Sequence, residues 1–274
     1  MENPPEESPA VLENKRAIVF HRLLAFLLAA AAALEIVSFF RPLPFAGQQD
    51  TALILLAAVS TLVSLWRQLP LQNVLLAAFG IIVMGGGLSA LGARTNLPFG
   101  PFTFASGLGP VFYNALPWTM PLIWVIVVFN SRGVARLILR PWRKNKTYGY
   151  RVIGLTAILV LLFDVALDPF ASRIKHFWLW SPTALKLTWE GAPLVNFFTW
   201  AAVTLLILLV VTPALIVKKP RGRSVRHYHP LGVWLGGLII FGTGCAVNGI
   251  WPPFFADAAM GLAVAIFSIR GAMW

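Results

Sequence analysis

Two carboxylic acids stand four residues apart in the segment Phe163-Asp164-Val165-Ala166-Leu167-Asp168-Pro169. In a helix this spacing places both side chains on one face, about 6 Å apart along the axis. Removal from water and a neighbouring like charge both favour the protonated form of a carboxyl group. The pair is therefore expected to retain a proton near neutral pH, which makes Asp164 and Asp168 candidate proton donors.

A structural role is the alternative for both acids. Asp168 would then end the helix before Pro169, and Asp164 would hydrogen-bond a neighbouring helix. However, an acid about one turn inside a membrane span costs a few kcal/mol unless it is paired, hydrated or neutralised, and such residues are usually functional. This favours a functional role for Asp164 and leaves both roles open for Asp168.

Three further segments fall at the same end of the predicted spans. Thr95 to Phe104 is rich in Pro and Gly and is expected to form a re-entrant or capping loop. Phe177-Trp178-Leu179-Trp180 follows the acid pair, and Trp189 to Asn196 leads into the next span, with Trp200 one turn beyond. Taken singly, each tryptophan suits an interfacial aromatic belt. Gathered around one acid pair, they would suit an extended apolar ligand or a cationic intermediate.

Long apolar runs must position these residues, because 58% of the 274 residues are hydrophobic and only 12% are charged. A hydrocarbon core of about 30 Å needs roughly 20 apolar residues in a helix. The sequence therefore predicts an all-α, polytopic integral membrane bundle with eight spans, or seven if one of the short runs does not cross. The predicted spans are Ile18–Phe40, Thr51–Trp66, Leu71–Leu91, Val111–Phe129, Val152–Asp168, Pro193–Val217, Leu231–Ile250 and Phe254–Ile269.

The start of the chain differs in composition from the rest. Residues 1–14 are rich in Pro and Glu and are predicted to form a disordered tail, whereas residues 15–274 are predicted to form a single transmembrane domain. Lys15, Arg16 and Arg22 precede a full-length apolar run. This arrangement is typical of a first span and not of a cleaved signal peptide.

The basic residues predict the orientation. With a cytoplasmic N-terminus, about 17 of the 22 Lys and Arg residues fall in cytoplasmic segments, most of them between Arg132 and Arg151 and between Lys218 and Arg226. The six acids beyond the tail instead fall at or near the outer side. We therefore expect a multi-pass protein of a bacterial inner (plasma) membrane with its N-terminus in the cytoplasm.

Several function classes are disfavoured. The net charge of +12 would indicate nucleic acid in a soluble protein, but here the basic residues lie in short loops, where topology and anionic membrane lipid explain them, so no nucleic-acid partner is expected. Cys245 has no partner for an intrachain disulfide, and the sequence lacks HExxH, GxSxG and P-loop motifs. His227 and His229 have no nearby Cys or acids, so no metal site is expected. Glycines at 85–87, and Gly232 with Gly236, are expected to permit close helix packing.

Taken in order, these segments resemble the membrane carotenoid biosynthesis protein family, which includes carotenoid 1,2-hydratases acting on acyclic carotenoid ends and on precursors of bacterioruberin. The resemblance extends roughly from Gly92 to Trp200. The matching motifs are Pro98-Phe99-Gly100-Pro101, Pro117 to Trp124, Asp164 with Asp168-Pro169, Trp178-x-Trp180, and Gly191-x-Pro193-x-x-Asn196. The sequence departs from the family pattern at Phe102 and Phe104, where relatives tend to have Tyr, and at Ser89, near an expected acid.

The resemblance implies a cofactor-independent carotenoid hydratase, a hydro-lyase that protonates the terminal 1,2 double bond of an acyclic carotenoid, or of another long isoprenoid, and adds water. This chemistry needs a desolvated acid, aromatic faces around a tertiary cation and a positioned water, but no metal or other cofactor. The expected catalytic residues are Asp164, Asp168 and Asn196. The expected substrate-binding residues are Phe99, Phe102, Phe104, Trp178, Trp180 and Trp200.

Two other functions fit the same residues. A non-catalytic carrier of carotenoids or isoprenoid lipids would use the same groove without turnover, and an isomerase or cyclase would use the same first protonation. The products distinguish them, since only hydration adds the mass of one water. The sequence identifies neither the exact carotenoid substrate nor an oligomeric state.

Overall fold

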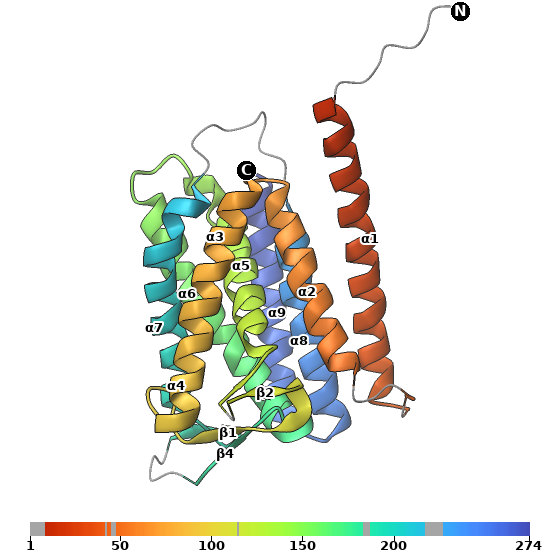
Figure 1. Ribbon diagram of the computed structural model, residues 1–274, viewed down its shortest axis with the longest axis vertical. Helices are drawn as coiled ribbons and strands as arrows, with labels where there is room; N and C mark the ends of the chain where they lie inside the picture. The colour runs from red at the N-terminus through yellow and green to blue at the C-terminus, as the bar shows by residue number, and fades with distance from the viewer. Residues whose placement is uncertain (1–8, 42, 45–47, 114, 183–186, 217–226) are drawn as a thin grey trace, which may run out of the picture.

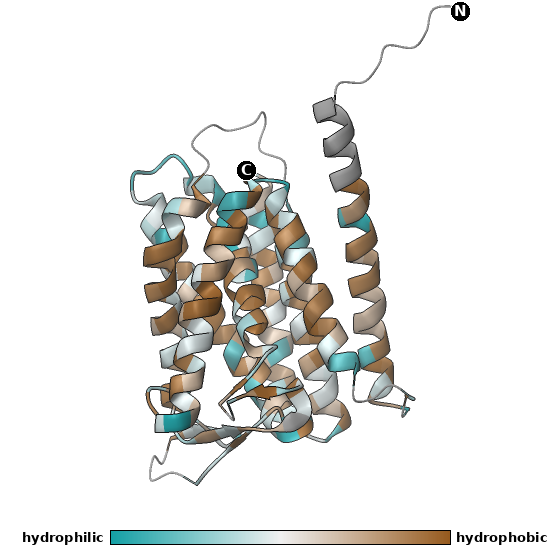
Figure 2. Ribbon diagram, viewed as in Figure 1, coloured by the Kyte–Doolittle hydropathy of each residue, from teal (hydrophilic) through white to brown (hydrophobic). Residues whose placement is uncertain are grey.

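The computed structural model describes residues 9–41, 43–44, 48–113, 115–182, 187–216 and 227–274. In this part of the chain, eight helical segments are long and apolar enough to cross a membrane, which confirms the predicted helical membrane bundle. Figure 1 shows them standing side by side, and Figure 2 shows apolar residues along their length with hydrophilic residues mainly toward the two ends. The α-helices are α1 (Pro9–Ser38), α2 (Gln49–Trp66), α3 (Leu71–Ile81), α4 (Gly87–Thr95), α5 (Met120–Ile138), α6 (Tyr148–Pro169), α7 (Leu194–Val211), α8 (His229–Val247) and α9 (Trp251–Ala272).

Short helical turns extend or join several of these helices. The π-helical turn Ile82–Gly86 joins α3 and α4 into one span, Leu71–Thr95, and the π-helical turn Phe170–Ile174 extends α6. Short 3₁₀ turns follow at Ser106–Leu108, Arg140–Trp142 and Thr212–Leu215.

The helices differ in how much of each is buried, with α5 the most buried and α1 the least. About 67% of the membrane-crossing window of α5 is buried, against 11% in α1. The central helix α5 contacts α2, α6, α8 and α9, whereas α1 packs chiefly on α2 and α8 at the edge. Residues that need to be kept from lipid and water are therefore best placed on α5 and its neighbours.

The predicted fourth span is present as α5, but its predicted bounds, Val111–Phe129, are wrong. Residues at its start instead form two short strands, β2 (Val111–Phe112) and β3 (Leu116–Pro117), which pair antiparallel before α5 begins at Met120. The helix then continues past Arg132, whose side chain had been expected in a loop. The Arg132 guanidinium donates a hydrogen bond at 3.1 Å to the carbonyl of Leu215, at the end of the 3₁₀ turn after α7.

The predicted end of the fifth span at Asp168 is also wrong, because the helix continues through Pro169 to Ile174. Proline has no N–H, so the carbonyl of Val165 loses its usual helical donor. The indole Nε1–H of Trp189 donates to that carbonyl at 3.1 Å instead. Roughly 15 Å of helix therefore separates Asp164 from Ile174, and the acid lies deeper than predicted.

The start of the chain agrees only in part with the expected tail. Helix α1 begins at Pro9, within the segment predicted to be disordered, and proline is compatible with a first helical turn. Residues 1–8 lie outside the described residues. So do Lys186 and the basic residues from Lys218 to Arg226, which entered the orientation count.

Three short antiparallel sheets lie in the connections at one end of the bundle, which we call the site end. They join β1 (Phe102–Phe104) to β4 (Trp178–Trp180), β2 to β3, and β5 (Thr188–Trp189) to β6 (Ala192–Pro193). Figure 1 places β1, β2 and β4 at the end away from both chain termini. The connection expected as a re-entrant or capping loop thus caps the site end and adds a strand to it.

We predict that the site end faces away from the cytoplasm, because the basic residues favour the opposite end. In a Cys245→Ala background, a membrane-impermeant maleimide added to intact cells should label Leu187→Cys but not Arg143→Cys. Both native side chains are exposed, so access to the reagent depends on the side of the membrane. Both variants should react in lysed cells, and labelling of Arg143→Cys alone in intact cells would reverse the orientation.

Candidate active site

Asp164 and Asp168 lie on one face of α6, and each is only 1% exposed. Asn196, in the first turn of α7, contacts both acids. Its Nδ2 donates to Asp164 Oδ2 at 2.8 Å and to Asp168 Oδ2 at 3.3 Å. The four-residue spacing places the two carboxyl groups on one face of α6, as predicted, and Asn196 is a donor that they share. Within the described chain, neither acid forms a salt bridge, and Asp164 Oδ1 has no hydrogen-bond partner.

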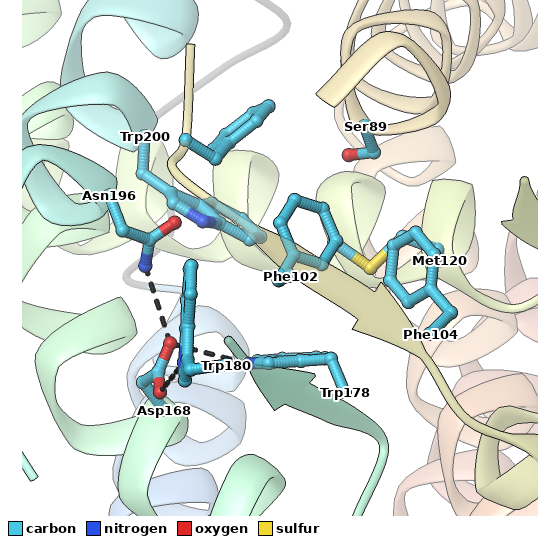
Figure 3. Close-up of a pocket in the computed structure, with 10 residues that line it drawn as sticks. Ser89, Phe102, Phe104, Met120, Asp168, Trp178, Trp180, Asn196 and Trp200 are labelled. Atoms are coloured by element: carbon cyan, nitrogen blue, oxygen red, sulfur yellow. Dashed lines mark hydrogen bonds between the residues drawn. The ribbon is translucent and has the colours of Figure 1, made fainter. Parts of the chain in front are cut away.

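Two indole N–H groups also point at Asp168. Trp180 Nε1 donates to Oδ1 at 2.9 Å, and Trp178 Nε1 donates to Oδ2 at 3.3 Å, as Figure 3 shows. Both side chains face the same way because they stand two apart on strand β4. Together with Asn196, they supply three N–H donors to a single carboxyl group, and such donors stabilise its negative charge.

Aromatic rings enclose a small pocket over Asp168. Strand β1 pairs with β4 so that Phe102 lies opposite Trp180 and Phe104 opposite Trp178. The ring centroids of Phe102 and Trp180 are 5.5 Å apart. The pocket has a volume of about 20 Å³, which is enough for one water molecule. It is lined by Ser89, Phe99, Phe102, Phe104, Met120, Asp168, Trp178, Trp180, Asn196 and Trp200.

The loop before β1 is fixed against α7 and β4. Thr199 Oγ1 donates to the carbonyl of Pro98 at 3.0 Å, and the backbone N–H of Ser181 donates to Pro101 at 2.9 Å. Gly100 has φ = +105°, and a Cβ there would lie 2.8 Å from Pro193 Cγ. Only glycine permits both the left-handed backbone and this close approach, so the Pro-Phe-Gly-Pro sequence is what brings Phe99 into the pocket.

A second layer of residues supports the pocket from the bundle interior. Trp124 of α5 stacks on Trp200 with ring centroids 3.8 Å apart, and its Nε1 donates to Ser89 Oγ at 2.9 Å. A Cβ at Gly85 would lie 2.5 Å from Trp124 Cγ, so the close packing expected at this glycine is confirmed. The span from α3 to α4 thereby fixes Trp124, which in turn fixes Trp200.

The structure brings together all nine residues predicted for the site. Every one lines the pocket except Asp164, which reaches it through Asn196. Sequence reasoning missed Met120, Trp124 and Trp189 as individual contributors. All three lay within segments already singled out, Met120 and Trp124 between Pro117 and Trp124 and Trp189 at the start of the segment to Asn196, but no local pattern distinguishes Met120 from an ordinary core residue.

This arrangement can protonate an apolar group. Asp168 provides a carboxyl group away from water, and three N–H donors stabilise the carboxylate that remains once the proton leaves. Ring faces of Phe102 and Trp180 beside it attract a carbocation. The pocket also has room for one water near the same carboxyl group.

Comparison with known proteins identifies the family to which the chain belongs. Residues 49–264 match the family described as carotenoid biosynthesis protein. A curated relative, the bisanhydrobacterioruberin hydratase of Haloarcula japonica, is 29% identical over 125 residues, which cover 46% of this chain and 40% of that protein. The chain thus matches less than half the length of this relative. No solved structure matches this chain. The family match includes the whole segment from Gly92 to Trp200 and extends beyond it at both ends, and the chain belongs to the carotenoid biosynthesis protein family.

Proposed function

We propose that this protein hydrates the terminal 1,2 double bond of an acyclic carotenoid end group, with Asp168 as the acid that delivers the proton. The observation that carries the proposal is that Asp168 borders the aromatic pocket while its two oxygens face three N–H donors. Family membership supports a carotenoid substrate, and the name of the Haloarcula relative supports hydration.

In this proposal the acid pair carries a single proton, which is on Asp168 when the substrate reacts. Two adjacent carboxylates away from water repel one another, and no cation pairs with them in the described part of the chain. Asp164 lies outside the pocket, so it acts on the substrate through Asp168 and Asn196. Sequence reasoning gave Asp164 the greater weight, whereas the pocket favours Asp168 as the donor in contact with substrate.

In the first step the proton passes from Asp168 to C2 of the alkene. A C–H bond forms there, and the two π electrons of the double bond are used in it, which leaves a tertiary cation at C1. The N–H groups of Trp178, Trp180 and Asn196 stabilise the carboxylate left on Asp168, and the neighbouring ring faces stabilise the cation.

In the second step a water molecule in the pocket attacks C1 and forms the new C–O bond. The oxygen then loses its extra proton to the Asp168 carboxylate, which restores the acid pair. Protons and electrons balance over the cycle. The reaction therefore proceeds with the residues already present at the site.

Substrate binding must widen the pocket, since about 20 Å³ accommodates water but not the end of a polyene. Phe104 is partly exposed, unlike the buried Phe102 and Trp178, and its side chain has no donor to Asp168, so it is the side chain that moves aside most easily. In this proposal the long apolar substrate approaches from the lipid at the site end, and the distribution of basic residues supports the outer leaflet of a bacterial plasma membrane as the side of this end.

Replacing the pocket acid should abolish most of the activity. Asp168→Asn keeps size and polarity but removes the proton, so hydration should fall by about 10²- to 10⁴-fold, and by more than in Asp164→Asn. The measurement is hydrated carotenoid formed per membrane-inserted protein in a carotenoid-producing host. Asp257→Asn is the matched control, because Asp257 is also a buried acid but lies in α9 away from the pocket, and it should retain activity.

Mass spectrometry of the same pigments separates the alternatives. A carrier returns the carotenoid intact, an isomerase or cyclase changes its structure without changing its mass, and a hydratase adds one water. Wild-type turnover in both Asp168→Asn and Asp164→Asn would show that the acid pair is structural and would sink the proposed mechanism.

The indole N–H of Trp180 should matter separately from its ring. Trp180→Phe keeps an aromatic face but removes a donor to Asp168, and a hydrogen bond to a charged group contributes about 1.5–3 kcal/mol, so hydration should slow about 10- to 100-fold. Trp189→Phe is the control, because it removes an indole N–H that donates to the Val165 carbonyl and not to Asp168. Its thermal stability should fall, while its turnover per folded protein should match that of the wild type. Equal losses of turnover in the two variants would contradict the role given to Trp180.

A further inference from the structure

A second and much larger cavity, of about 540 Å³, lies against a different face of α6. Phe163 and Leu167 border it, whereas Asp164 and Asp168 belong to the active-site network. Its other walls come from α1, α2, α5 and α8. Helix α1 lies outside residues 49–264, so one wall of this cavity is not part of the family match.

The cavity has the form of a long slot. Its lining runs from Ala25 to Ile36 on α1 and from His229 to Phe241 on α8, which corresponds to roughly 17 Å of helix on each side. Most of the lining side chains are aliphatic or aromatic. A slot of this length and polarity fits an extended hydrocarbon chain better than a compact or charged molecule.

Two glycines show that side chains do not close this space. Gly232 and Gly236 both line the slot, and an added Cβ at either position would meet no atom within 4 Å beyond its own helix. The expectation that these glycines permit close helix packing is therefore wrong. Helix packing at Gly85 is tight, but here the missing side chains widen the slot.

Each end of the slot has a polar side chain, with His229 of α8 at one end and Glu35 of α1 at the other. Glu35 is 1% exposed, and its Oε1 pairs with the ammonium group of Lys175. The same ammonium lies 2.8 Å from Asp50 Oδ1. Burial lowers the pKa of Lys175, but the Asp50 and Glu35 carboxylates outweigh it and leave that pKa raised, so the ammonium stays charged and engaged. Glu35 Oε2 is buried and has no hydrogen-bond partner among the described residues.

We propose that this slot binds a single-chain hydrocarbon ligand that ends in a hydroxyl group, with the chain along α1 and α8 and the hydroxyl donating to Glu35. A hydroxyl supplies the one neutral donor that Glu35 Oε2 lacks. A carboxylate or phosphate head group would instead face two carboxylates whose shared cation is already engaged. Isoprenoid alcohols and straight-chain fatty alcohols both have this chemistry.

Binding of radiolabelled alcohols to the full-length protein in phosphatidylcholine nanodiscs tests the site. Geranylgeraniol and hexadecanol are the two probes, and whichever binds more tightly identifies the source of the chain. Binding should be saturable and should weaken by about tenfold or more in Gly236→Leu, which fills the slot. Gly154→Leu is the matched control, because Gly154 is also a helical glycine with no atom within 4 Å of an added Cβ but lies outside the slot.

Two comparisons do not depend on the glycine variants. Hexadecane should compete for the wild-type site much less well than hexadecanol, since it cannot donate to Glu35. Asp168→Asn should bind alcohol like the wild type, because Asp168 borders the other cavity. Equal competition by hexadecane, unchanged binding in a folded Gly236→Leu, or loss of binding in Asp168→Asn would each overturn the proposal.

Discussion

Two carboxyl groups buried together in one membrane-spanning helix are the constraint on which the rest of the site depends. Asp164 and Asp168 are each only 1% exposed, so the protein itself must supply most of their hydrogen-bond donors. These donors come from two segments outside α6: Asn196 lies at the start of α7, and the two indoles lie on β4. Three of these donors contact Asp168, and of the two acids only Asp168 lines the pocket.

The irregular parts of the fold follow from placing those donors. Because α6 continues through Pro169, the Val165 carbonyl needs a substitute donor, and Trp189 supplies it from the connection to α7. That connection also carries β4, which pairs with β1 and so brings Phe102 over Asp168. The two connections cover one another through the pairing of β1 with β4. The short strands at the site end therefore position the aromatic pocket.

Much of this was predictable because the bilayer imposes simple rules on sequence. Apolar runs predicted eight spans, and acids and tryptophans at span ends predicted the site. Local patterns failed where the outcome depended on a distant partner. Val111–Phe112 and Leu116–Pro117 are apolar but pair as strands, and Pro169 would end a helix if Trp189 did not replace the missing donor. The pairing of β1 with β4 and the open space beside Gly232 and Gly236 have no local signal, since both depend on what lies opposite.

Helix α6 thus separates two unlike cavities. One is a small aromatic pocket bordered by Asp168 of α6, and the other is a long slot to which α6 contributes only the apolar side chains of Phe163 and Leu167.

The central claim is that the acid pair holds one proton at neutral pH. Infrared difference spectra between the wild-type protein and a variant with both Asp164→Asn and Asp168→Asn, recorded in membranes at neutral pH, test it most directly. The difference should contain a protonated-carboxyl C=O band that shifts in D₂O. A difference containing only carboxylate bands would show both acids ionised and would contradict the claim.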